Sequence, residues 1–105
     1  MELGNLYRVG DLDRSSEVFE KLSGNEMVEV ERIVSTGQST PAGEWLVQEK
    51  NEFVVLLSGR AILKFEDGKE VELVPGDHLT IPANLPHRVD HTQTDPCTIW
   101  LAVHY

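Results

Sequence analysis

Apolar and polar residues alternate along much of the second half of the chain. Residues 61–66 and 70–73 each place apolar side chains two apart, which is the spacing of a strand with one buried face. Asp67-Gly68 stands between them and indicates a tight hairpin. Residues 53–57 form a continuous apolar run typical of a buried strand, and residues 99–103 add another alternating segment. Short strands at this spacing predict an all-β sandwich or barrel.

The N-terminal part of the chain shows a different spacing. A helix over residues 14–22 would place three apolar side chains on one side: Val18, Phe19 and Leu22. Ser15 or Ser16 can cap this helix, and Ser23-Gly24 can end it. We therefore expect one short helix, which would depend on packing against the sheets for its stability.

Composition and charge limit the class of protein. The length fits one domain over residues 1–105, with an N-terminal strand and helix in residues 1–24 and a barrel in residues 25–105. Asp and Glu number 18 against 9 Lys and Arg, and the resulting charge of −9 argues against a nucleic-acid partner. We find neither a membrane span nor a signal peptide and expect a cytoplasmic protein. Cys97 is the only cysteine, so no internal disulfide can form.

Two histidines suggest a site. His87 and His91 are four residues apart with Val89 between them, so in one extended strand all three side chains point to the same face. Two neutral imidazoles on an inward face can ligate zinc, iron, copper or nickel, with further ligands from elsewhere. The alternative is that one or both are surface histidines or hydrogen-bonded core residues. The pattern leaves both interpretations open.

A carboxylate stands at the beginning of the buried strand. Glu52 directly precedes the apolar run and shares a face with Val54 and Leu56. Gln48 and Leu46 would continue that face if the strand extended backward. Glu52 is therefore either a surface residue at a strand end or an inward-pointing ligand or general base.

From Gly43 to Tyr105 the chain resembles the cupin family, and in particular small single-domain bacterial cupins. The second cupin motif reads Gly, five residues, Pro, one residue, Gly, two residues, His, three residues, Asn; at these spacings the chain has Gly76, Pro82, Asn84, His87 and His91. Asn84 replaces a Gly and tolerates the positive φ that this Gly would supply. Glu52 and Gly59 match the second half of the first motif.

The resemblance implies a double-stranded β-helix, or jelly-roll, barrel with one pocket. Metal-binding cupins use two first-motif histidines, which here fall on Leu46 and Gln48, or on Trp45 and Val47 with a longer spacing. The first motif is therefore degenerate. The set that remains for one divalent ion (Zn, Fe, Mn or Ni) is His87, Glu52, His91 and Gln48. The side chains expected to line the pocket are Leu46, Val54, Leu56, Val89 and Trp100.

Two partners are expected. A small molecule would occupy the pocket. A second copy of the chain would form a homodimer, because open sheets of this size need their edge strands covered. The resemblance to cupins implies that the segment around Leu6–Val9 supplies an exchanged or added strand. No membrane partner is expected.

Three functions from different classes remain open. The first is a metal-assisted enzyme that acts on a small molecule, with Glu52 as ligand or general base. The second is a metal-free barrel that binds or senses a small molecule through the same polar cluster. The third is a structural or partner-binding domain with a relict pocket. Resemblance to a fold family does not decide between them.

Overall fold

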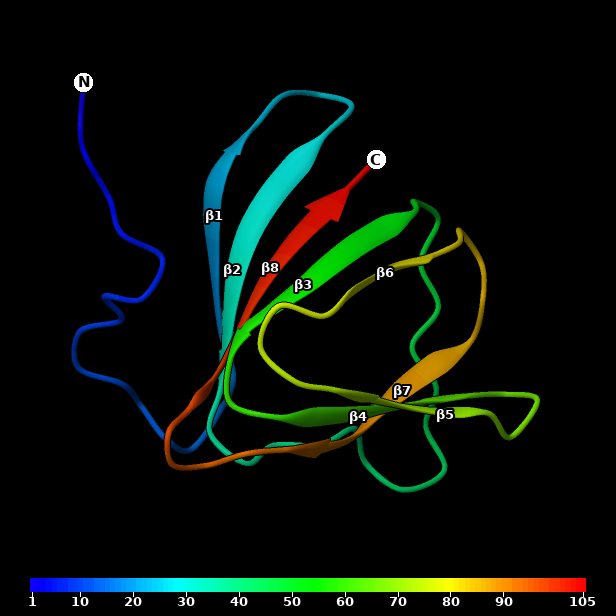
Figure 1. The fold of residues 1–105 in the computed structure, drawn as a ribbon. Helices are drawn as coiled ribbons and strands as arrows, with labels where there is room; N and C mark the ends of the chain where they lie inside the picture. The colour runs from blue at the N-terminus through cyan, green and yellow to red at the C-terminus, as the bar shows by residue number, and fades with distance from the viewer.

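Eight strands form two antiparallel sheets that face each other across the interior of the protein (Figure 1). The computed structural model describes residues 1–105. One sheet has the order β1-β2-β8-β3-β6, and the other has the order β5-β4-β7. The strands are β1 (Val18–Gly24), β2 (Glu29–Ser35), β3 (Glu52–Ser58), β4 (Ala61–Phe65), β5 (Glu70–Leu73), β6 (His78–Ile81), β7 (His87–Thr92) and β8 (Thr98–His104). The all-β, two-sheet prediction is confirmed.

The prediction of a short helix over residues 14–22 is wrong. Val18–Gly24 is strand β1, which pairs with β2 along its length as an antiparallel hairpin. The turn is stabilised by Asn25, whose Oδ1 accepts hydrogen bonds from the N–H groups of Met27 and Val28 at 2.8 and 2.9 Å. A partner strand directly after the segment pairs its backbone through hydrogen bonds at alternate residues, whereas three apolar side chains give a short helix little to bury.

Ser15, one of the two serines that could cap that helix, lies in a turn instead. The Ser15 hydroxyl donates to the Asp13 carboxylate at 2.6 Å, and the Ser15 backbone N–H donates to the same oxygen at 3.0 Å. These hydrogen bonds stabilise the ionised carboxylate and lower the pKa of Asp13.

No helix that could span a membrane is present.

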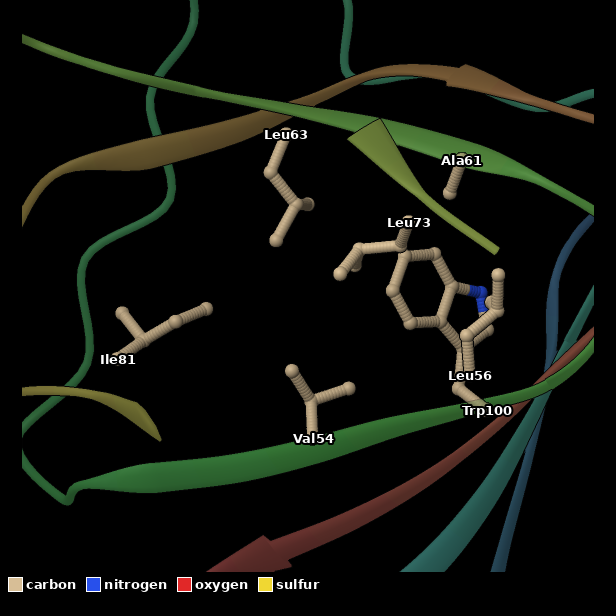
Figure 2. Close-up of a cluster of buried hydrophobic side chains, with 7 residues drawn as sticks. All are labelled: Val54, Leu56, Ala61, Leu63, Leu73, Ile81 and Trp100. Carbon is tan, nitrogen blue, oxygen red and sulfur yellow. The ribbon is translucent and has the colours of Figure 1, made fainter. Parts of the chain in front are cut away.

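The core lies between the two sheets and is built from the inward faces of β3, β4, β5, β6 and β8. Figure 2 shows its buried side chains meeting between the sheets, with the Trp100 ring among aliphatic residues: Val54, Leu56, Ala61, Leu63, Leu73, Ile81 and Trp100. Leu56 is fully buried, and the alternation of β3 places it on the same face as Val54 and Glu52. The period-two pattern of the sequence therefore identifies the inward face of β3 correctly.

Two special backbone positions shape the turns. Gly59 has φ 79° and lies against β8 so closely that a Cβ would come within 2.7 Å of Thr98 Cα, so only glycine fits there. Asn84 has φ 65°, so the expectation that Asn replaces a positive-φ glycine at this motif position is confirmed. Both residues belong to turns that bring the sheets together, and neither is a hydrophobic packing residue.

We expect Leu56→Ala to lower the free energy of unfolding by about 2–5 kcal/mol, because it removes a fully buried side chain and leaves a cavity. Urea denaturation followed by circular dichroism measures this change. Val74→Ala is the matched control, since Val74 is 44% exposed and its truncation should cost less than about 0.5 kcal/mol. Equal losses for the two variants would contradict the observed packing.

Candidate functional site

A cavity of about 380 Å³ lies between the sheets. Its apolar wall continues the core and includes Val54, Leu63, Ile81, Val89 and Trp100. Its polar side chains come mainly from β2, β3, β7, β8 and the segment that precedes β3: Glu17, Glu31, Ser39, Thr40, Gln48, Glu52, His87 and His104. An apolar wall with a few convergent polar groups is the usual make-up of a small-molecule site.

The register of three neighbouring strands lines up polar side chains along one wall of the cavity. Glu52 on β3 lies directly opposite His104 on β8, and paired residues of an antiparallel sheet project to the same face. Glu31 on β2 is the diagonal neighbour of His104. The His104 Nε2 and a Glu31 carboxylate oxygen are 2.8 Å apart, so the imidazole N–H donates to the ionised carboxylate.

The segment before β3 forms the opposite edge of the cavity by running along β7. Leu46 and His87 exchange two backbone hydrogen bonds, with N···O distances of 2.7 and 3.0 Å, in an isolated bridge. The Gln48 carbonyl accepts a further bond from the Asn84 N–H at 2.7 Å. These bonds place the Gln48 side chain against Glu52, and its Nε2 donates to Glu52 Oε1 at 2.8 Å.

His87 is the most deeply buried ionisable residue of the cavity, with 3% of its surface exposed. Its Nδ1 lies 2.9 Å from the Leu85 carbonyl oxygen. A carbonyl oxygen can only accept, so Nδ1 carries the hydrogen and the Nε2 of the neutral ring is an acceptor. Nε2 faces Glu52 Oε1 at 4.0 Å, which is too long for a hydrogen bond.

His91 does not reach the cavity, and the expectation that it shares a face with His87 is wrong. Ile62 of β4 pairs with His91, but the next residue, Leu63, pairs with Val89, so Asp90 is an extra residue on β7. Such a bulge shifts the alternation by one position. His91 therefore lies exposed on the outer face, while His87 and Val89 remain on the inner face.

Comparison with known proteins agrees with the motif spacing and with this geometry. Residues 30–104 match the family model of the cupin domain. The chain belongs to the cupin family. Curated proteins contain no significant match.

Solved structures show the same fold. A provisional mannose-6-phosphate isomerase from Ralstonia eutropha is 35% identical over 99% of this cupin and 97% of that chain, with a TM-score of 0.93. A cupin superfamily protein from Desulfitobacterium hafniense is 18% identical over 90% and 81% of the two chains, with a TM-score of 0.75. The Fe(II) form of HppE is 18% identical over 85% of this cupin and 50% of that chain, with a TM-score of 0.70.

The structure brings together most of the residues expected at the pocket of this cupin. Glu52, Gln48 and His87 meet in the cavity wall, and the side chains that line it as expected are Leu46, Val54, Val89 and Trp100. Leu56 does not line the cavity, because it lies deeper, in the core between the sheets. The expectation for Leu56 followed from its shared face with Val54, and alternation gives the face of a residue but not its depth.

Three ionisable residues of the cavity were not expected from the sequence: Glu17, Glu31 and His104. The signal for His104 was present, since Trp100, Ala102 and His104 alternate along one face of β8. Glu17 could not be placed without the turn before β1. Its carboxylate accepts a hydrogen bond from the Ser35 hydroxyl at 2.8 Å, and that hydroxyl in turn accepts one from Trp100 Nε1 at 3.2 Å.

The side chains do not fit the divalent metal that cupins often hold. No three His, Cys, Asp or Glu side chains lie close enough together to hold a metal ion. The expected four-ligand set loses His91 to the outer face, and the Gln48 amide donates its N–H to the carboxylate that would have to bind the metal. Glu52 and His87 alone fall short of the three protein ligands of a catalytic metal site.

We expect the neutral His87 ring to carry its hydrogen on Nδ1. Long-range proton–nitrogen correlation spectra at alkaline pH distinguish the two neutral tautomers, and the signals that disappear in His87→Gln belong to this ring. The exposed His91 provides an internal comparison, since it has no hydrogen bond that selects a tautomer. A hydrogen on His87 Nε2 would contradict the bond to Leu85.

Proposed function

We propose that this cupin binds a small molecule in its cavity without a metal ion. The observation that carries the proposal is the pair formed by Glu52 and His87, which face each other across 4.0 Å in a largely apolar cavity with no third metal-binding side chain beside them. Glu52 accepts one hydrogen bond from Gln48 and His87 Nε2 accepts none from the chain, so both side chains have acceptor capacity left for a ligand in the cavity. A ligand that enters the cavity supplies the donor.

The apolar wall gives such a ligand most of its binding energy, and the polar groups orient it. Aliphatic side chains from both sheets, together with Trp100, lie along the cavity, so a ligand loses water on several sides. Gln48 holds Glu52 from behind, and the Leu85 carbonyl fixes the His87 ring. Both acceptors are therefore held in position before the ligand arrives, which lowers the entropic cost of binding.

A metal-assisted enzyme is the second candidate. Glu52 and His87 stand at their cupin motif positions and both line the cavity, and the Fe(II) form of HppE shares the fold. A metal held by these two residues would lack the first-motif histidines, whose places are taken by Leu46 and Gln48, or by Trp45 and Val47 with the longer spacing. This makes the metal-free function the better supported of the two.

The second copy of the chain remains part of the proposal. β1 is an edge strand with exposed apolar side chains, of which Phe19 is 62% and Leu22 41% exposed. Residues 1–10 form no strand within one chain, and the carbonyls of Asn5, Leu6 and Arg8 instead accept hydrogen bonds from Arg32. We propose that two copies associate along β1, which would cover this edge.

We expect untagged protein to contain less than one-tenth of an equivalent of Zn, Fe, Mn and Ni by elemental analysis, roughly the background expected where no ligand set is complete. Adding each metal should leave the thermal midpoint unchanged, because a site-bound ion would raise it by mass action. His87→Ala and His91→Ala serve as paired variants. One equivalent of metal that is lost in His87→Ala and kept in His91→Ala would overturn the metal-free function.

We expect a dimer by sedimentation velocity, and Leu22→Glu should shift it to monomer by placing a charge on the β1 edge. Val74→Glu is the control, since Val74 is exposed to a similar degree but lies outside β1. Deleting residues 1–10 tests the contribution of the N-terminal segment in the same assay and should also favour monomer. If the unaltered protein sediments as a monomer, the proposal of a dimer is wrong.

A further inference from the structure

We infer that the ligand of the cavity is an organic cation: an ammonium group that donates to both His87 and Glu52, attached to an apolar body. This inference rests on the proposed metal-free binding function and names the ligand class. It follows from three independent features, which are the tautomer of His87, the charge of the cavity lining and the apolar wall opposite the polar groups.

The first feature is that two acceptors face each other. The Leu85 carbonyl accepts the hydrogen of His87 Nδ1, so in the neutral ring Nε2 keeps its lone pair, on a side chain that lines the cavity and is 3% exposed. Glu52 is 8% exposed, and its ionised carboxylate can only accept. Nε2 has no hydrogen-bond partner, and Gln48 is the single donor to Glu52. A group with at least two N–H donors placed beside the 4.0 Å gap satisfies both acceptors, and an ammonium has them.

The second feature is the charge of the lining. Three carboxylates line the cavity, from Glu17, Glu31 and Glu52, and the lining contains no Lys or Arg. His104 offsets Glu31 through its hydrogen bond, and the Ser35 hydroxyl donates to Glu17, but nothing in the cavity carries a fixed positive charge. The chain as a whole adds a net charge of −9. A phosphate ester or carboxylate ligand would be repelled, whereas a cation would be attracted.

The third feature is the space beside the polar groups. The cavity volume of about 380 Å³ lies in the range of small-molecule sites. Val54, Leu63 and Val89 line it near His87 and Glu52 and offer no polar partner. A bare inorganic cation would leave this wall unused, and an amine with a hydrocarbon or aromatic body would cover it.

The test compares four probes that share one apolar body: benzylamine, benzyl alcohol, benzoate and benzyl phosphate. Titration calorimetry in the presence of a chelator measures each affinity for the full-length protein. We expect benzylamine to bind about tenfold or more tightly than benzyl alcohol, because the ammonium adds the attraction of opposite charges to its hydrogen bond with Glu52, whereas the neutral alcohol makes the hydrogen bond alone. Benzoate and benzyl phosphate should bind more weakly than the alcohol.

Glu52→Gln removes the charge with little change in shape, and it should lower benzylamine affinity about tenfold and benzyl alcohol affinity by a clearly smaller factor, because only the amine also loses an opposite charge. Glu70→Gln is the matched control, since it makes the same change in net charge at an exposed position outside the cavity. Should Glu52→Gln fail to fold, the comparison of the four probes on the unaltered protein decides the question alone.

The outcomes separate the inference from the function on which it rests. Equal binding of amine and alcohol, or preferred binding of an anion, overturns the inference that the ligand is a cation. Either result leaves the metal-free binding function standing. Failure of benzylamine to bind overturns the cation as well. Binding of Zn²⁺ or Fe²⁺ alone, lost in His87→Ala and not displaced by benzylamine, overturns both.

Discussion

The antiparallel pairing of β3 with β8 sets the register on which the rest of the structure depends. Along this one ladder Leu56 lies opposite Trp100, Val54 opposite Ala102, and Glu52 opposite His104. The inward face thus changes from fully apolar to polar within a few residues. A slip of one residue would turn every one of these side chains outward, so the same register builds the core and presents the polar wall of the cavity.

The fold could be predicted from the sequence wherever one strand face is buried and the other is not. β3, β4 and β5 were visible as apolar runs, alternation and an Asp-Gly turn. β1 could not be predicted as a strand, because the spacing of Val18, Phe19 and Leu22 also fits a helix. Local spacing carries no information about the neighbouring strand, β2, that pairs with the segment. Hydrogen bonding to β2 decided between the two structures.

The candidate site was predictable in part, for a similar reason. Glu52, Gln48 and His87 could be placed because regular alternation holds on β3 and the cupin spacing extends to His87. His91 could not be placed correctly, because the bulge at Asp90 depends on how β7 pairs with β4. That bulge leaves no signature in the spacing of the sequence. Conversely, His104 lies on an ordinary strand face, and continuing the alternation beyond Trp100 would have found it.

The segment that carries Leu46 and Gln48 is joined to β7 by a few backbone hydrogen bonds and contributes no side chain to the buried core cluster. With the shorter motif spacing, these two positions are where the first cupin motif has its histidines. Exchanging their side chains changes the chemistry offered to the cavity without removing a packed residue, and the backbone bonds that hold the segment do not depend on side-chain identity. The stability of the barrel is therefore largely independent of which side chains this segment presents to the cavity.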